Sequence, residues 1–88
     1  MLIRILTEDK NHLRVRELCA KRFDAFTILH GMGCWRGQLE PSLAIEIAVL
    51  NDDPVPYFII KQLALDIKEF NDQDAVLIEY IESTNVLI

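Results

Sequence analysis

The stretch that decides the fold is the central one, residues 26–50, which reads FTILHGMGCWRGQLEPSLAIEIAVL. Residues 26–29 are β-branched or aromatic, and residues 42–50 have strand character throughout. Between them Gly31, Gly33 and Gly37 fall within seven positions, which predicts an irregular loop rather than a regular element. Two strands joined without an intervening helix predict an antiparallel hairpin with a long, glycine-rich tip.

An amphipathic helix is expected on each side of this hairpin. Upstream, residues 12–23 place apolar side chains at helical spacing, and either Asp9 or Asn11 can cap the first turn. Downstream, a helix begins near Pro54 or Pro56, because proline is tolerated in the first turn, and it stops before residues 71–72. Its apolar positions recur at three- and four-residue steps: Ile60, Leu63, Ala64, Ile67 and Phe70.

The first and last strands along the chain complete the pattern. Residues 2–7 and 75–81 are short and aliphatic, and polar residues follow each of them. The predicted order is strand, helix, strand, strand, helix, strand. This order predicts an α+β, ferredoxin-like βαββαβ fold, with a four-stranded antiparallel sheet and both helices on one face.

Length and composition limit what the chain can be. With 88 residues, 51% of them hydrophobic and 26% charged, residues 1–88 form one globular domain. The formal net charge of −5 argues against general binding of nucleic acid, because a phosphate backbone is attracted to a basic surface.

The targeting signals and the cysteines indicate the compartment. The apolar start is too short for a signal peptide and contains Arg4, and no stretch is long enough to cross a bilayer. Cys19 and Cys34 match neither a disulfide scaffold nor a CxxC site. We therefore expect a cytoplasmic protein that does not associate with membranes.

The first and last strands along the chain are apolar on both faces, which predicts an oligomer. Leu2 and Leu6 alternate with Ile3 and Ile5, and two helices can cover only one of these sets. A second apolar face of this size is buried in most soluble proteins. We expect a homo-oligomer, most simply a trimer, that packs through the open faces of its sheets and uses the apolar residues 86–88 in the same contact.

This order of elements, the glycine-rich excursion and the terminal apolar strand resemble the PII-like superfamily of small trimeric proteins, whose relatives include the CutA-like proteins. The resemblance covers the whole chain at the level of topology. In that superfamily the loop after the second strand and the clefts between subunits bind nucleotides or other small anions. The resemblance therefore implies such a site at residues 31–42. The loop is shorter than that of the true PII proteins and lacks their modifiable tyrosine, and no basic phosphate-contacting set lies near the second helix. These differences argue against adenine-nucleotide and 2-oxoglutarate sensing of the PII kind.

Residues 31–42 are also similar to a G-x-G-x-W-x-G-x-x-E-x-S pattern found in uncharacterised small bacterial and phage proteins. The glycines allow a ligand to approach the backbone amides, and Arg36 offers a planar fork suited to phosphate or carboxylate. Trp35 can stack on a base or pack in a subunit interface. The alternative for the whole segment is a hairpin tip that needs glycine to turn. The candidate ligand-binding residues are Gly31, Gly33, Trp35, Arg36, Gly37, Glu40 and Ser42.

Other polar residues are weaker candidates. Glu46 falls on the face of its strand opposite Ile45, where an ion pair with Arg4 explains it better than a ligand does. His30 is better explained as a hydrogen-bonded residue at a strand end than as a general base, and Cys34 lacks a histidine partner. The histidines and cysteines are not at metal-ligand spacings, so we expect no metal and no cofactor.

The sequence therefore predicts a non-enzymatic binding protein for a small, nucleotide-like anion, acting as a sensor or as a sequestering protein. The ligand would lie in the cleft between subunits, beside the glycine-rich loop. The alternative is a structural or protein-interaction module that contacts its partner through Trp35 and Arg36. An enzyme ranks below both, because no positioned nucleophile and base can be identified.

Overall fold

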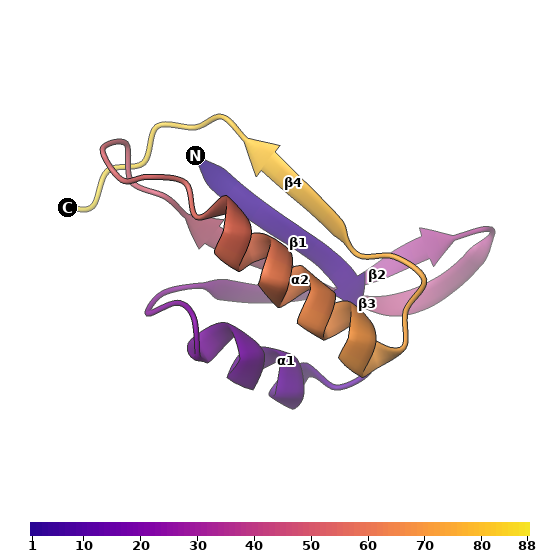
Figure 1. Cartoon of the computed structure of the whole chain (residues 1–88). Helices are drawn as coiled ribbons and strands as arrows, with labels where there is room; N and C mark the ends of the chain where they lie inside the picture. The colour runs from indigo at the N-terminus through magenta and orange to yellow at the C-terminus, as the bar shows by residue number, and fades with distance from the viewer.

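The computed structural model describes residues 1–88 and contains six regular elements. They are β1 (Leu2–Glu8), α1 (His12–Ala20), β2 (Thr27–Trp35), β3 (Gln38–Ala48), α2 (Tyr57–Asn71) and β4 (Leu77–Ile81). The strands form one antiparallel sheet in the order β2-β3-β1-β4, and both helices lie on the same face of it (Figure 1). The predicted ferredoxin-like βαββαβ fold is confirmed.

The core lies between this sheet and the two helices. On β1, Ile3 and Ile5 are fully buried, and on β3 the same is true of Leu43 and Ile45. Strand side chains alternate between the two faces, so every second residue of β1 and β3 points toward the helices. These strands pack against the apolar stripes of the helices, which consist of Val15, Leu18, Cys19, Ile60, Leu63, Ala64 and Ile67.

The helices begin and end for local reasons. The side chain of Asn11 accepts a hydrogen bond from the Arg14 amide at 3.1 Å and so caps α1. At the other end, α1 stops at Ala20 although the apolar pattern extends to Phe23, and the Arg22 guanidinium donates a hydrogen bond to the Leu18 carbonyl at 3.2 Å in the turn that follows. In α2 the last turn closes at Asp72, whose φ of +53° is left-handed.

The segment predicted as an irregular loop is strand instead, and this prediction was wrong. β2 continues through Trp35 and β3 begins at Gln38, so the connection between them is only Arg36 and Gly37. Both connecting residues have positive φ, +51° and +81°, as a two-residue type I′ hairpin turn requires. Of the three glycines only Gly37 has a positive φ. The other two pair within the sheet, which glycine weakens but does not prevent.

Beyond the end of β1, strands β2 and β3 continue as a pair without a third strand beside them. Glu8 is the last residue of β1 that pairs with β3, and it lies opposite Ser42. From there residues 31–42 project as a two-stranded ribbon, seen at the right of Figure 1, which we call the arm. No helix covers the arm, and its large side chains are exposed, as Met32 (66%) and Leu39 (73%) illustrate.

The sheet face away from the helices, which we call the open face, is mixed rather than purely apolar. Leu2 and Leu6 are half-buried there, and Leu77 is 55% exposed. Between them lies a charged group: Arg4 contacts Glu46 at 2.9 Å and Glu79 at 3.9 Å. The predicted Arg4–Glu46 ion pair is confirmed. The prediction that the strands are apolar on both faces holds only in part, because Arg4 and Glu79 interrupt the apolar residues of the open face.

None of the helices is both long enough and apolar enough to cross a membrane.

Candidate functional site

The arm brings most of the predicted site residues onto one face. Strand alternation places Gly31, Gly33 and Trp35 on the open side of β2. In the register of the hairpin, Ser42, Glu40 and Gln38 lie opposite these three residues in turn. Arg36 and Gly37 occupy the turn beyond them.

The glycines leave a strip of backbone on this face without side chains. A Cβ atom at Gly33 would lie 3.4 Å from the Ser42 hydroxyl oxygen, a tight contact, whereas one at Gly31 would lie at an ordinary 3.8 Å. Gly33 therefore keeps the space beside the Ser42 hydroxyl open, whereas a Cβ at Gly31 could be accommodated. Neither residue has a positive φ, so the backbone conformation does not require glycine at either position.

Trp35 and Arg36 form one unit at the tip. The Arg36 guanidinium lies 5.5 Å from the centre of the indole ring, within the range of a cation–π interaction. Trp35 is 56% exposed, so one part of its ring is available to another molecule. An aromatic plane beside a guanidinium can accept both a flat ring and an anionic group.

Two carboxyl groups lie side by side at the foot of the arm. A hydrogen bond that the protonated Glu40 carboxyl donates to the neighbouring Glu8 carboxylate raises the pKa of Glu40 above its ordinary value, and partial burial adds to this effect. The same hydrogen bond lowers the pKa of Glu8, with a further contribution from Lys10, whose amine lies 3.3 Å from the Glu8 carboxylate. The pair therefore holds a proton on Glu40 more readily than an isolated glutamate does.

The structure also brings together residues that the sequence analysis kept apart. His12 and His30 contact the same carboxylate, that of Asp9, and their rings lie 5.1 Å apart. The i,i+3 spacing of Asp9 and His12 is visible in the sequence, but the approach of His30 depends on the tertiary fold.

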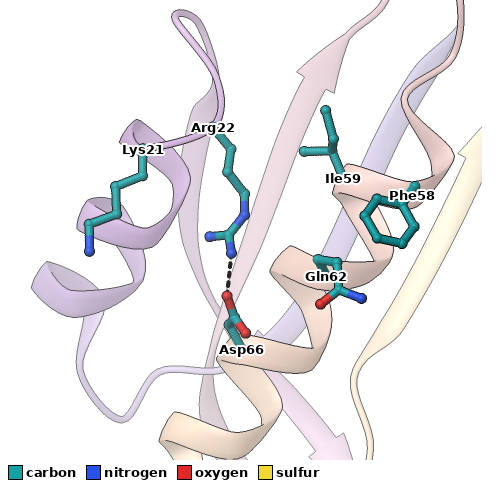
Figure 2. A pocket seen from close by; sticks show the side chains of 6 residues that line it. All are labelled: Lys21, Arg22, Phe58, Ile59, Gln62 and Asp66. Atoms are coloured by element: carbon teal, nitrogen blue, oxygen red, sulfur yellow. Dashed lines mark hydrogen bonds and ion pairs between the residues drawn. The ribbon is translucent and has the colours of Figure 1, made fainter.

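A separate hollow lies between α1 and α2 and contains none of the predicted site residues (Figure 2). The Arg22 guanidinium that points into it is paired with Asp66, and the hollow is open to solvent between the helices. The paired carboxylate neutralises the arginine, which leaves Lys21 as the one cation of the lining without an ion pair. Its lining consists of Lys21, Arg22, Phe58, Ile59, Gln62 and Asp66.

The sequence matches no protein-family model and no curated protein. Among solved structures, the chain is similar to a phage SAM lyase in complex with S-methyl-5'-thioadenosine, with a TM-score of 0.58 and 20% identity over 88% of this chain and 76% of that one. It is also similar to CPII, a nitrogen regulatory PII-like protein from Thiomonas intermedia K12 bound to ADP, AMP and bicarbonate. That match has a TM-score of 0.61 and 16% identity over 98% of this chain and 93% of that one. The chain therefore has the PII-like, ferredoxin-like fold.

Proposed function

We propose that this chain is a non-enzymatic binding protein for a small, anionic, nucleotide-like ligand, acting as a sensor or a sequestering protein in the cytoplasm. The observation that carries the proposal is the open side of the arm. There a strip of bare backbone at Gly31 and Gly33 leads to an exposed indole and guanidinium at Trp35 and Arg36.

Each polar group of this surface suits one part of a nucleotide. The indole of Trp35 suits the base, because stacking on an aromatic ring tolerates any base. Arg36 suits a phosphate, which its planar fork can bind through two hydrogen bonds. Glu40 and Ser42 suit ribose hydroxyls, since a carboxylate or hydroxyl oxygen accepts hydrogen bonds from them.

The ligands of the two similar structures support the same chemical class. One is bound to S-methyl-5'-thioadenosine and the other to ADP and AMP, so both hold an adenosine group. Bicarbonate in the second structure is a further small anion. At identities of 20% and 16%, these structures support a ligand class for this chain and not a particular ligand.

A homotrimer would complete the site. One face of the arm has no covering layer within the chain, and Leu2, Leu6 and Leu77 leave apolar surface on the open face. Packing of open faces between subunits would bury this surface and place the arm of one chain against the next. The exposed residues Val86, Leu87 and Ile88 follow the anchored Asn85, whose side chain donates to the Met1 and Val49 carbonyls, and they would add to the same contact.

The test is calorimetric titration of tag-free protein with AMP, ADP and S-methyl-5'-thioadenosine. Arg36→Ala should weaken the binding of ADP by at least about tenfold while the fold stays intact, because loss of a hydrogen bond to a charged group costs roughly 1.5–3 kcal/mol. Trp35→Ala should weaken the binding of all three by roughly 1–3 kcal/mol. Arg16→Ala, which removes an exposed arginine on α1, is the matched control and should bind normally.

Undiminished ADP affinity in Arg36→Ala would exclude an anion site at the arm. The non-enzymatic part of the proposal has its own test, which is incubation with SAM followed by chromatography. SAM should remain unconsumed, and consumption that depends on Glu40 would show that the carboxyl pair does chemistry.

The second candidate function is a protein-interaction module. The exposure of Trp35, Met32 and Leu39 on the arm favours it, because aromatic and arginine side chains dominate binding at protein interfaces. In that case Trp35→Ala would abolish capture of a partner protein while no nucleotide bound to the wild-type chain. The titration above separates the two functions directly.

A further inference from the structure

Three potential metal ligands meet on the helix side of the sheet, at the foot of the arm. The Nδ1 atom of His30 lies 3.2 Å from one carboxylate oxygen of Asp9, and the Nδ1 atom of His12 lies 3.6 Å from the other. One ligand atom from each residue lies within 4.8 Å of the other two. The chain has only two histidines, and both are in this cluster.

The backbone holds these residues in place. The Asp9 amide donates to the Pro41 carbonyl at 2.9 Å, which ties the turn after β1 to the arm. Asn11 caps α1 and so fixes His12 in the first turn. His30 lies opposite Leu43 in the β2–β3 ladder, on the side that faces the helices. The cluster therefore joins three separate elements at defined positions.

The spacing suits a transition-metal ion. Zinc binds histidine nitrogen and carboxylate oxygen at roughly 2.0–2.2 Å, so two ligands of a tetrahedral site lie about 3.3–3.5 Å apart. Each histidine lies at about this distance from a different oxygen of the Asp9 carboxylate: His30 is 3.2 Å from Oδ2 and His12 is 3.6 Å from Oδ1. A small rotation of the exposed histidine side chains would therefore bring both nitrogens and one carboxylate oxygen around a single ion. The two histidine side chains are 52% and 56% exposed, which leaves them free to close around an ion and leaves room for water as a fourth ligand.

No neighbouring cation opposes an ion at this position. Lys10 is adjacent to Asp9 in sequence, but its amine donates to the Asn71 carbonyl at 2.7 Å and pairs with Glu8 at 3.3 Å. Two imidazoles and one carboxylate are borderline donors, which favour Zn²⁺, Co²⁺ or Ni²⁺ over Mg²⁺ or Ca²⁺.

We propose that Asp9, His12 and His30 bind one divalent transition-metal ion per chain, with Zn²⁺ as the representative, and that the ion clamps the β1–α1 turn onto the base of the arm. This site lies on the side of β2 opposite Gly31 and Gly33. It is therefore independent of the proposed nucleotide site, and either site can exist without the other.

The experiment is calorimetric titration of tag-free protein with ZnCl₂ in a buffer that does not chelate zinc, with no nucleotide present. The wild-type chain should bind one Zn²⁺ per chain. His12→Gln, His30→Gln and Asp9→Asn should each weaken that binding by at least about 100-fold, because loss of a mere outer-shell partner already costs about 10- to 100-fold. Circular dichroism would check that each variant remains folded.

Two matched variants test whether zinc binds elsewhere. Cys34→Ser removes the exposed thiol on the same side of β2, and Asp24→Asn removes an exposed carboxylate in the α1–β2 connection. Both should bind zinc as the wild type does. Loss of binding in Cys34→Ser would assign the ion to the thiol and overturn the proposal.

An NMR titration of the wild-type chain with zinc tests the proposal even if a variant does not fold. In NMR spectra, the ring signals of both histidines should shift with the same half-saturation point as zinc is added. No saturable zinc binding, or a shift of one histidine alone, would show that the cluster is a metal-free hydrogen-bonded tie and would overturn the proposal.

Discussion

Strands β2 and β3 run through two regions of the sheet: the arm, residues 31–42, and the four-stranded remainder, which we call the base. The two regions differ in what covers them. On β3, Ile45 in the base is fully buried and Leu39 in the arm is 73% exposed, although both residues belong to the side of the strand that faces the helices. The base has two helices above it, whereas the arm extends past them (Figure 1). A side chain on this strand is therefore buried only where a helix covers it. We expect the base to contribute most of the stability, and the exposed arm is available for contacts with other molecules.

The largest expected change in the free energy of unfolding comes from truncating a buried side chain in the base. Ile45→Ala should lower the free energy of unfolding by about 2–5 kcal/mol, because it opens a cavity in a closed core. Leu39→Ala, on the same strand and side, should change it by no more than about 0.5 kcal/mol. Urea unfolding of both variants measures the difference. Equal losses would mean that the arm contributes to stability as the base does.

A change in stability of intermediate size is expected at the turn of the arm. Gly37→Ala should destabilise the arm by about 1–2 kcal/mol, because φ is +81° there and a Cβ is strained in that conformation although it would touch nothing. Gly31→Ala, whose Cβ would have ordinary contacts, should cost less. Amide hydrogen exchange should show protection in the arm falling by a factor of roughly 5–30 in the first variant while the base is unchanged. If protection fell equally in the base and the arm, the two would unfold as one unit.

The smallest effect is expected between the two helices. Asp66→Asn removes the ion pair with Arg22 (Figure 2), and these side chains are 38% and 24% exposed. Water and salt screen such a pair, so the loss should be below about 1 kcal/mol and should shrink further in 1 M salt. Asp74→Asn, an exposed carboxylate with no ion pair, is the control. A loss of several kcal/mol, independent of salt, would mean that the pair is part of the core.

The helices and strands of the base could be predicted from the sequence, because their apolar residues recur at the spacing of one buried face. The apolar spacing of α2 and the alternation of Ile3 and Ile5 with Leu2 and Leu6 were sufficient for the fold. Which of the two apolar sets of β1 the helices bury could not be predicted, because both sets are aliphatic. The partner of Glu46 also followed from alternation, because only Arg4 could face it across the neighbouring strand.

The arm could not be predicted in the same way. Glycine at positions 31 and 33 was interpreted as a break, but hydrogen bonding to β3 overrides the low strand propensity of glycine. The signal that was present is the pair Arg36-Gly37, a two-residue turn that ends in glycine. The approach of His30 to His12 could not be predicted either, because it depends on how the β1–α1 turn lies against β2.

The most direct test of the central claim is native mass spectrometry of the tag-free chain at micromolar concentration, with AMP and ADP added in turn. The claim is that the open face and the arm form a ligand site completed between subunits. It predicts assemblies of three chains that retain nucleotide, with no nucleotide on single chains. A chain that stays monomeric, or a trimer that retains no nucleotide at any concentration tried, would contradict it.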